Sequence, residues 1–81
     1  MNKSLLQLLE EEKKAVEDIN YFKQTVSDFH NRLFEHVENV ESVESLKRII
    51  NIYEEKVKES EKNLLAVRTE IKEYFSFIQS L

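Results

Sequence analysis

The stretch Val37-Glu38-Asn39-Val40-Glu41-Ser42-Val43-Glu44-Ser45 decides the fold, because it separates two helical patterns whose registers do not match. Before it, mostly apolar residues step by three and four from Leu5 to Val40, and a second such series runs from Val43 to Leu81. At the junction, two consecutive spacings between core residues are each three residues long, where an unbroken heptad would alternate three and four. An uninterrupted coiled coil would have to overwind to absorb this slip, whereas a chain reversal lets each helix keep its own register.

The register break therefore predicts an all-α fold, an antiparallel helical hairpin in one domain over residues 1–81. We expect helix 1 at about 5–37, a turn at about 38–42 and helix 2 at about 43–81. Composition agrees, because the 81 residues include no glycine and no proline, which tight turns and irregular loops commonly use. A continuous helix of roughly 115 Å is the alternative.

Capping residues mark the expected helix ends. Ser4 and Gln7 fit a capping box, in which each side chain accepts a hydrogen bond from the backbone N–H of the other residue. Asn39 is the best candidate for the left-handed residue that ends helix 1. Ser42 would then cap helix 2, with Glu44 in its first turn.

A reversal centred near Val40 and Glu41 predicts that facing residues have numbers summing to about 82. Large residues then meet small ones, as close packing requires. The expected pairs are Phe22 with Ser60, Phe29 with Tyr53, Leu33 with Ile49 and Ile50, Ala15 with Val67, and Glu12 within reach of Arg68.

Apolar residues beyond the seam predict further packing partners. A two-stranded seam needs two apolar positions in seven, while helices of bundles use three or more. Here the extra positions leave apolar surface that a lone hairpin cannot cover. We expect a protein partner bound through apolar helix faces, either a homodimer forming a four-helix bundle or coiled coil, or a hetero-bundle. The extra apolar residues are Leu6, Leu9, Val16, Phe34, Val37, Ile49, Ile52, Leu65, Phe75 and Phe77.

The residues that could carry chemistry do not form a recognisable site. His30 and His36 lie on different helical faces, and neither has an acid three residues before it, as a di-iron bundle would require. We expect His30 on the surface and His36 at the edge of the core as a structural residue. The acids alternate with lysines on solvated faces, and the chain has no cysteine. We therefore expect no catalytic residues, no cofactor, no metal and no enzymatic activity.

Charge and hydropathy limit the partners and the compartment. The net charge is −4, with acids and bases interleaved, so there is no basic stripe to collect phosphates and nucleic-acid binding is not expected. The first residues lack the pattern of a signal peptide, and no apolar stretch reaches membrane-spanning length. We expect a cytoplasmic protein, although secretion without a cleavable signal would leave the same pattern.

The strongest candidate for a partner-binding site is the open end of the hairpin, where the two termini meet. Structurally this end could simply be the core of the dimer, while functionally it would bind a helix of another protein. Its residues are Leu5, Leu6, Leu9, Tyr74, Phe75, Phe77, Ile78 and Leu81. Outward-facing Tyr21 and Phe34 form a second candidate patch.

The sequence thus predicts a small interaction protein, such as an adaptor, chaperone subunit or assembly factor, that works by helix–helix packing. In shape and composition alone it resembles small helical secretion chaperones and hairpin subunits of coiled-coil assemblies. Two alternatives stay open. The chain could be an acidic inhibitor that masks a basic surface of another protein, or a coiled-coil segment that oligomerises a larger protein.

Overall fold

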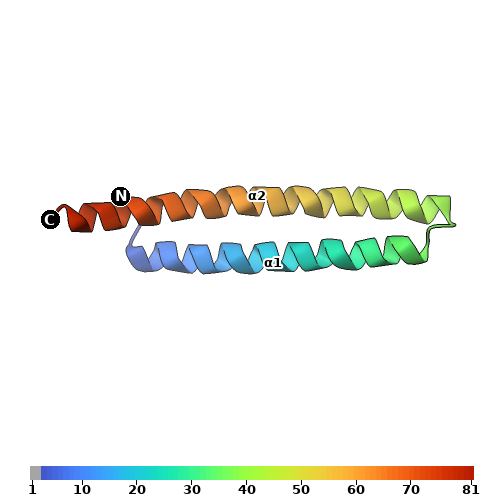
Figure 1. Cartoon of the computed structure of the whole chain (residues 1–81), viewed down its shortest axis with the longest axis horizontal. Coiled ribbons are helices and arrows are strands. Elements are labelled where there is room, and N and C mark those ends of the chain that lie inside the picture. Colours follow the sequence, from blue (N-terminus) through green and yellow to red (C-terminus); the bar gives the residue numbers. More distant parts are fainter. Residues whose placement is uncertain (1–2) are drawn as a thin grey trace.

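The computed structural model describes residues 3–81, and it is a hairpin of two long helices (Figure 1). Helix α1 spans Leu5–Glu35 and helix α2 spans Val40–Gln79. They run antiparallel and form a body measuring 64 × 16 × 14 Å between Cα atoms. The predicted all-α hairpin is confirmed, and the continuous helix is wrong. Neither helix is long and apolar enough to cross a membrane.

The start of α1 is fixed by the predicted capping box. The Gln7 backbone N–H donates to Ser4 Oγ at 3.1 Å, and the Ser4 backbone N–H donates to Gln7 Oε1 at 3.0 Å. Two backbone donors at the helix start are therefore satisfied reciprocally.

The turn differs from the prediction in position and in the roles of its residues. Helix α1 ends at Glu35, two residues early, with His36 as its C-cap, and α2 begins at Val40, three residues early. Asn39 does not end α1 in a left-handed conformation. It is instead the N-cap of α2, with extended backbone (φ −104°, ψ 103°) and its Oδ1 accepting the Ser42 N–H at 3.1 Å. Ser42 is therefore not the cap, because it lies inside the first turn.

The reversal needs no left-handed residue. No residue among 3–81 has a positive φ angle. The His36 N–H donates to the carbonyls of Arg32 and Leu33, and the Asn39 N–H donates to the His36 carbonyl. These bonds satisfy backbone groups that the end of a helix leaves open, which explains how the chain turns without glycine.

The seam between the helices follows the predicted register. Its most buried residues among 3–81 are Leu8 and Ile19 in α1 with Ile50 and Ile71 in α2, all at seam positions. The rings of Phe29 and Tyr53 stack with centroids 6.0 Å apart. The residue numbers of that pair sum to 82, so the predicted register is confirmed in the half of the hairpin nearer the turn.

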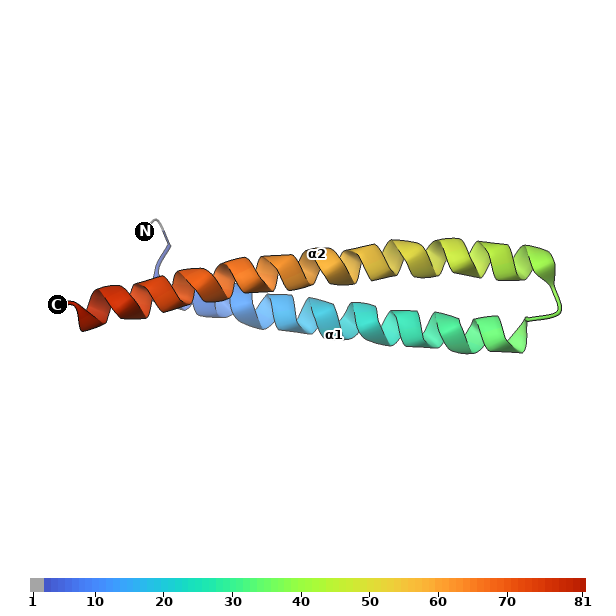
Figure 2. The ribbon, with the colours of Figure 1, turned by 45° about the horizontal axis from the view of Figure 1, so that its top comes forward.

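The two helices differ in length, and the difference appears at the open end. Helix α2 projects past the start of α1 (Figure 1), and in the rotated view it passes across α1 there (Figure 2). Both views place the two helices side by side along α1. The last turns of α2 therefore extend the seam with little of α1 to cover them.

Candidate interaction surfaces

The open end of the hairpin exposes most of the apolar residues predicted to bind a partner. Leu5 and Tyr74 are half-buried, because they still lie against the opposite helix. The other six are exposed, by 66% for Leu6, 44% for Leu9, 48% for Phe75, 56% for Phe77, 45% for Ile78 and 90% for Leu81. Ile71, one heptad before Ile78 on the same face, is only 9% exposed. The difference reflects the projection of α2 beyond α1.

The remaining surface divides into two flanks, one on each side of the seam. Residues on one face of a helix recur every three or four positions. One flank comprises positions 6, 9, 13, 16, 20, 23, 27, 30 and 34 of α1 with 40, 44, 47, 51, 54, 58, 61, 65, 68, 72, 75 and 79 of α2. The other comprises 7, 11, 14, 18, 21, 25, 28, 32 and 35 with 45, 49, 52, 56, 59, 63, 66, 70, 73, 77 and 80. We call the first of these the basic flank and the second the acidic flank.

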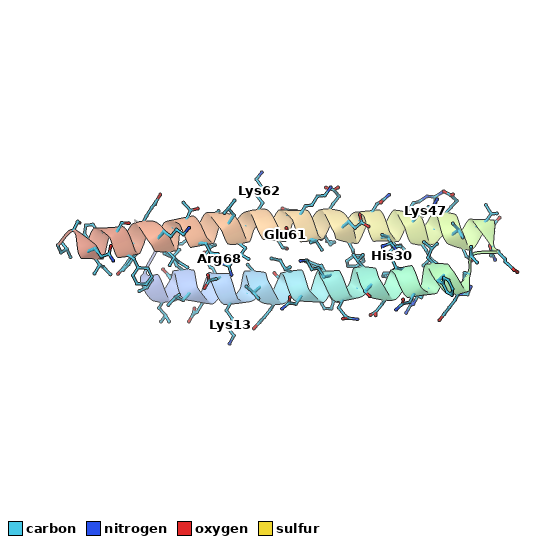
Figure 3. The ribbon with its side chains drawn as sticks, viewed as in Figure 1. Lys13, His30, Lys47, Glu61, Lys62 and Arg68 are labelled. Carbon is cyan, nitrogen blue, oxygen red and sulfur yellow. The ribbon has the colours of Figure 1, made fainter. Side chains whose placement is uncertain are left out.

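Contacts between the helices confirm that these positions share a side. On the basic flank, Lys23 Nζ lies 4.0 Å from Glu61 Oε1, and His30 Nε2 lies 3.9 Å from Glu54 Oε1. Figure 3 shows His30, Glu61 and Arg68 in the strip between the two helices, with Lys13 and Lys62 on opposite outer edges. A shallow groove on this flank has Val26 and Val57 as apolar lining and Lys23, Glu54, Lys58 and Glu61 beside them.

A second groove confirms the acidic flank. It is lined by the predicted pair Ala15 and Val67 and by Ser60, whose small side chains leave the space, together with Lys3, Glu11, Lys14, Asp18 and Asn63. A hydrogen bond and ion pair between Lys3 Nζ and Glu11 Oε2 at 3.0 Å borders the groove. The hydrogen bond to the Glu11 carboxylate raises the pKa of Lys3 above its usual value, because it favours the charged ammonium.

The two flanks have opposite charge, although acids and bases are interleaved along the sequence. The basic flank carries six Lys or Arg residues and three Glu residues. The acidic flank carries three Lys or Arg residues and seven Asp or Glu residues. One side of the hairpin therefore has a net positive charge, although the whole chain has a net charge of −4. Sequence reasoning missed this separation, because it becomes visible only when charges are sorted by their side of the seam.

Exposed apolar residues follow the same division. Among the large apolar residues that are exposed on the flanks, six lie on the basic flank and three on the acidic flank. Those of the basic flank gather toward the two ends of the hairpin, as Leu6, Leu9, Leu65 and Phe75 toward the open end and Phe34 and Val40 near the turn. The acidic flank exposes Tyr21, Ile52 and Phe77.

The second predicted patch, Tyr21 with Phe34, is not one surface. Both side chains are exposed, but Tyr21 belongs to the acidic flank and Phe34 to the basic flank. The ring of Tyr21 packs edge-on against Phe22, with centroids 5.6 Å apart. Tyr21 and Phe34 therefore lie on different sides of the hairpin.

Ion pairs and cation–aromatic contacts border the seam between the two helices. Arg68 Nε donates to Glu12 Oε2 at 3.0 Å, as predicted. On the acidic flank, the Arg32 guanidinium lies 5.2 Å from the Phe29 ring centroid, and Lys56 Nζ lies 5.8 Å from that of Phe22. Such long side chains cover apolar rings with their stems while keeping the charge in water.

The two histidines do not form a site with other residues. His30 is on the surface, as predicted, whereas His36 is exposed at the C-cap of α1 rather than at the edge of the core. No group of three or more His, Asp or Glu residues within 3–81 is arranged to hold a metal ion. The candidate functional features of the described residues are therefore their exposed apolar and charged surfaces.

Comparison of the chain with models of protein families, with curated proteins and with solved structures finds no match. Function must therefore be argued from the open end and the two flanks.

Proposed function

We propose that this protein is a non-enzymatic protein–protein interaction module, a small helical adaptor, chaperone subunit or assembly factor, that acts through helix–helix packing. The observation that carries the proposal is the open end, where six of the eight expected residues are exposed on two helices that meet there. The flanks extend this surface along the hairpin.

The size of the exposed surface supports a partner. All six open-end residues are at least 44% exposed, and exposed apolar residues gathered in one region mark interaction sites, whereas scattered ones do not. Covering such surface is favourable by roughly 25 cal/mol for each Å² of apolar area. A partner helix laid against the last turns of α2 would complete the seam around Ile78 and Leu81.

The test is a double substitution at the open end, Phe75→Ser with Phe77→Ser. We expect this variant to lose at least tenfold in association, measured by light scattering for self-association and by co-purification for other partners. Removing two aromatic anchors takes away the type of contact that dominates interfaces. The control is Val37→Ser, which removes an exposed apolar residue at the turn, away from the open end and from both flanks. Equal association of the native chain and the open-end variant would contradict the proposal.

The acidic flank favours a second candidate function, an inhibitor that masks a basic surface of another protein. Its seven acids against three bases provide a local negative charge that could attract such a surface. Binding of this kind should weaken steeply as salt rises, because exposed charges are screened beyond about 10 Å at 0.1 M salt. Apolar association at the open end should survive high salt, so one titration separates the two functions.

A further inference from the structure

We propose that the partner of the basic flank is the acidic flank of a second copy of this chain, so that copies stack side by side through unlike flanks. The proposal deepens the function above and rests on it, because it names one occupant of the apolar surface. It starts from the opposite charges of the two flanks.

Charge decides which flanks meet. A two-fold dimer joining basic flank to basic flank would bring an excess of three positive charges against an equal excess. Joining the acidic flanks would oppose two sets of seven acids. Like charges facing each other across an interface are unfavourable, whereas opposite potentials steer association and fix orientation. Only the unlike pairing brings the six cations of one flank to the seven acids of the other.

Apolar residues then meet when the two copies point the same way. In that arrangement Phe77 of the acidic flank lies at the open end, at the level of Phe75, Leu6 and Leu9 of the neighbouring basic flank. Ile52 lies in the half of α2 nearer the turn, where the basic flank exposes Phe34 and Val40. Charged residues, including the pair of Lys23 with Glu61, occupy the middle. The contact would thus combine apolar clusters toward both ends with oppositely charged residues along its whole length, since Lys13, Lys72 and Glu73 lie toward the open end as well.

The flanks are large enough for a stable contact. Viewed onto one flank, the whole hairpin extends 64 by 16 Å between Cα atoms, an area of roughly 1,000 Å², while standard interfaces bury about 800 Å² per partner. Because the two faces in contact are different, the contact does not close on itself. After each addition the stack still presents one free basic flank at one end and one free acidic flank at the other, so the mean mass should rise with concentration.

Two charge-reversed variants test the pairing. Lys13→Glu with Lys72→Glu alters the basic flank, and Glu59→Lys with Glu73→Lys alters the acidic flank. All four residues are exposed, and circular dichroism verifies that each variant remains helical. We expect each variant alone to self-associate at least tenfold more weakly than the native chain in sedimentation velocity. Their equimolar mixture should regain association, because the unaltered acidic flank of the first variant still complements the unaltered basic flank of the second.

The matched controls carry the same charge changes at positions of the helices that belong to neither flank. They are Arg48→Glu with Lys62→Glu, and Glu10→Lys with Glu17→Lys. We expect both controls to associate as the native chain does. Loss of association in the controls as well would show that net charge, rather than flank pairing, governs assembly, and would overturn the proposal.

Other results overturn the pairing without touching the proposed function. A closed dimer that is insensitive to Glu59→Lys with Glu73→Lys would mean that the acidic flank is not in contact. A chain that stays monomeric at all concentrations would mean that a different protein covers the basic flank. In both cases the Phe75→Ser with Phe77→Ser experiment still decides whether the open end binds a partner, so the two proposals fail separately.

Discussion

Asn39 shows what one residue contributes to this fold. Its side chain satisfies the Ser42 N–H at the start of α2, and replacing such a cap by alanine costs about 1 kcal/mol. We expect Asn39→Ala to lower the free energy of unfolding by this amount in urea titrations. Ser42→Ala is the informative control, because the structure leaves that hydroxyl without a capping role and the change should stay within about 0.5 kcal/mol. A larger loss for Ser42→Ala would place the cap at residue 42.

The same two residues show where sequence reasoning ends at this scale. The Ser4–Gln7 capping box was predictable, because it is a local pattern followed by a long helical series. At the turn, Asn39 and Ser42 both have side chains able to cap, and both lie in a polar segment without glycine. Local preference cannot rank them. Which of the two residues caps α2 depends on where α1 ends, and the end of α1 depends on packing along the whole seam.

At the scale of the helices, the seam supplies the stability and the flanks do not. Ile50 is 4% exposed and Ile52, on the same helix, is 55% exposed. We expect Ile50→Ala to cost about 2–5 kcal/mol, since it removes buried methyl groups and leaves a cavity. Ile52→Ala should change unfolding by less than about 0.5 kcal/mol. Urea unfolding of dilute protein checks both, and equal costs would mean that the seam is misplaced or that Ile52 is buried in solution.

The register of the helices was predictable from the sequence, and the sorting of charge between flanks was not. Phe29 with Tyr53 and Glu12 with Arg68 both follow from a reversal near residues 40 and 41. That prediction works because apolar periodicity fixes which face is buried. The flank positions recur with the same period, but apolar periodicity does not say which flank of α1 adjoins which flank of α2, and charges of both signs alternate along the chain. Their sides appear only once contacts such as Lys23 with Glu61 fix which side each position takes.

At the scale of the whole molecule, length distinguishes a hairpin from a continuous helix, and thickness detects side-by-side stacking of copies. The hairpin is 64 Å long with a radius of gyration of 18.2 Å for Cα atoms, whereas a continuous helix would reach roughly 115 Å. Small-angle scattering of dilute protein should therefore give a maximum dimension of roughly 70 Å, allowing for side chains.

Raising the protein concentration should then change thickness before length. Copies stacked through unlike flanks add roughly 10 Å of width each, the usual spacing of packed helices, while the first dimer stays nearly as long as one hairpin. Light scattering on the same samples gives the mass, so each shape is tied to a number of copies. A dimer close to twice the length of the hairpin would mean that open ends meet end to end, because the exposed turns of α2 around Ile78 and Leu81 would then overlap. That result would keep the open end as the binding site and remove the flanks from the contact. A dimer of greater width but unchanged length would instead place the contact on the flanks.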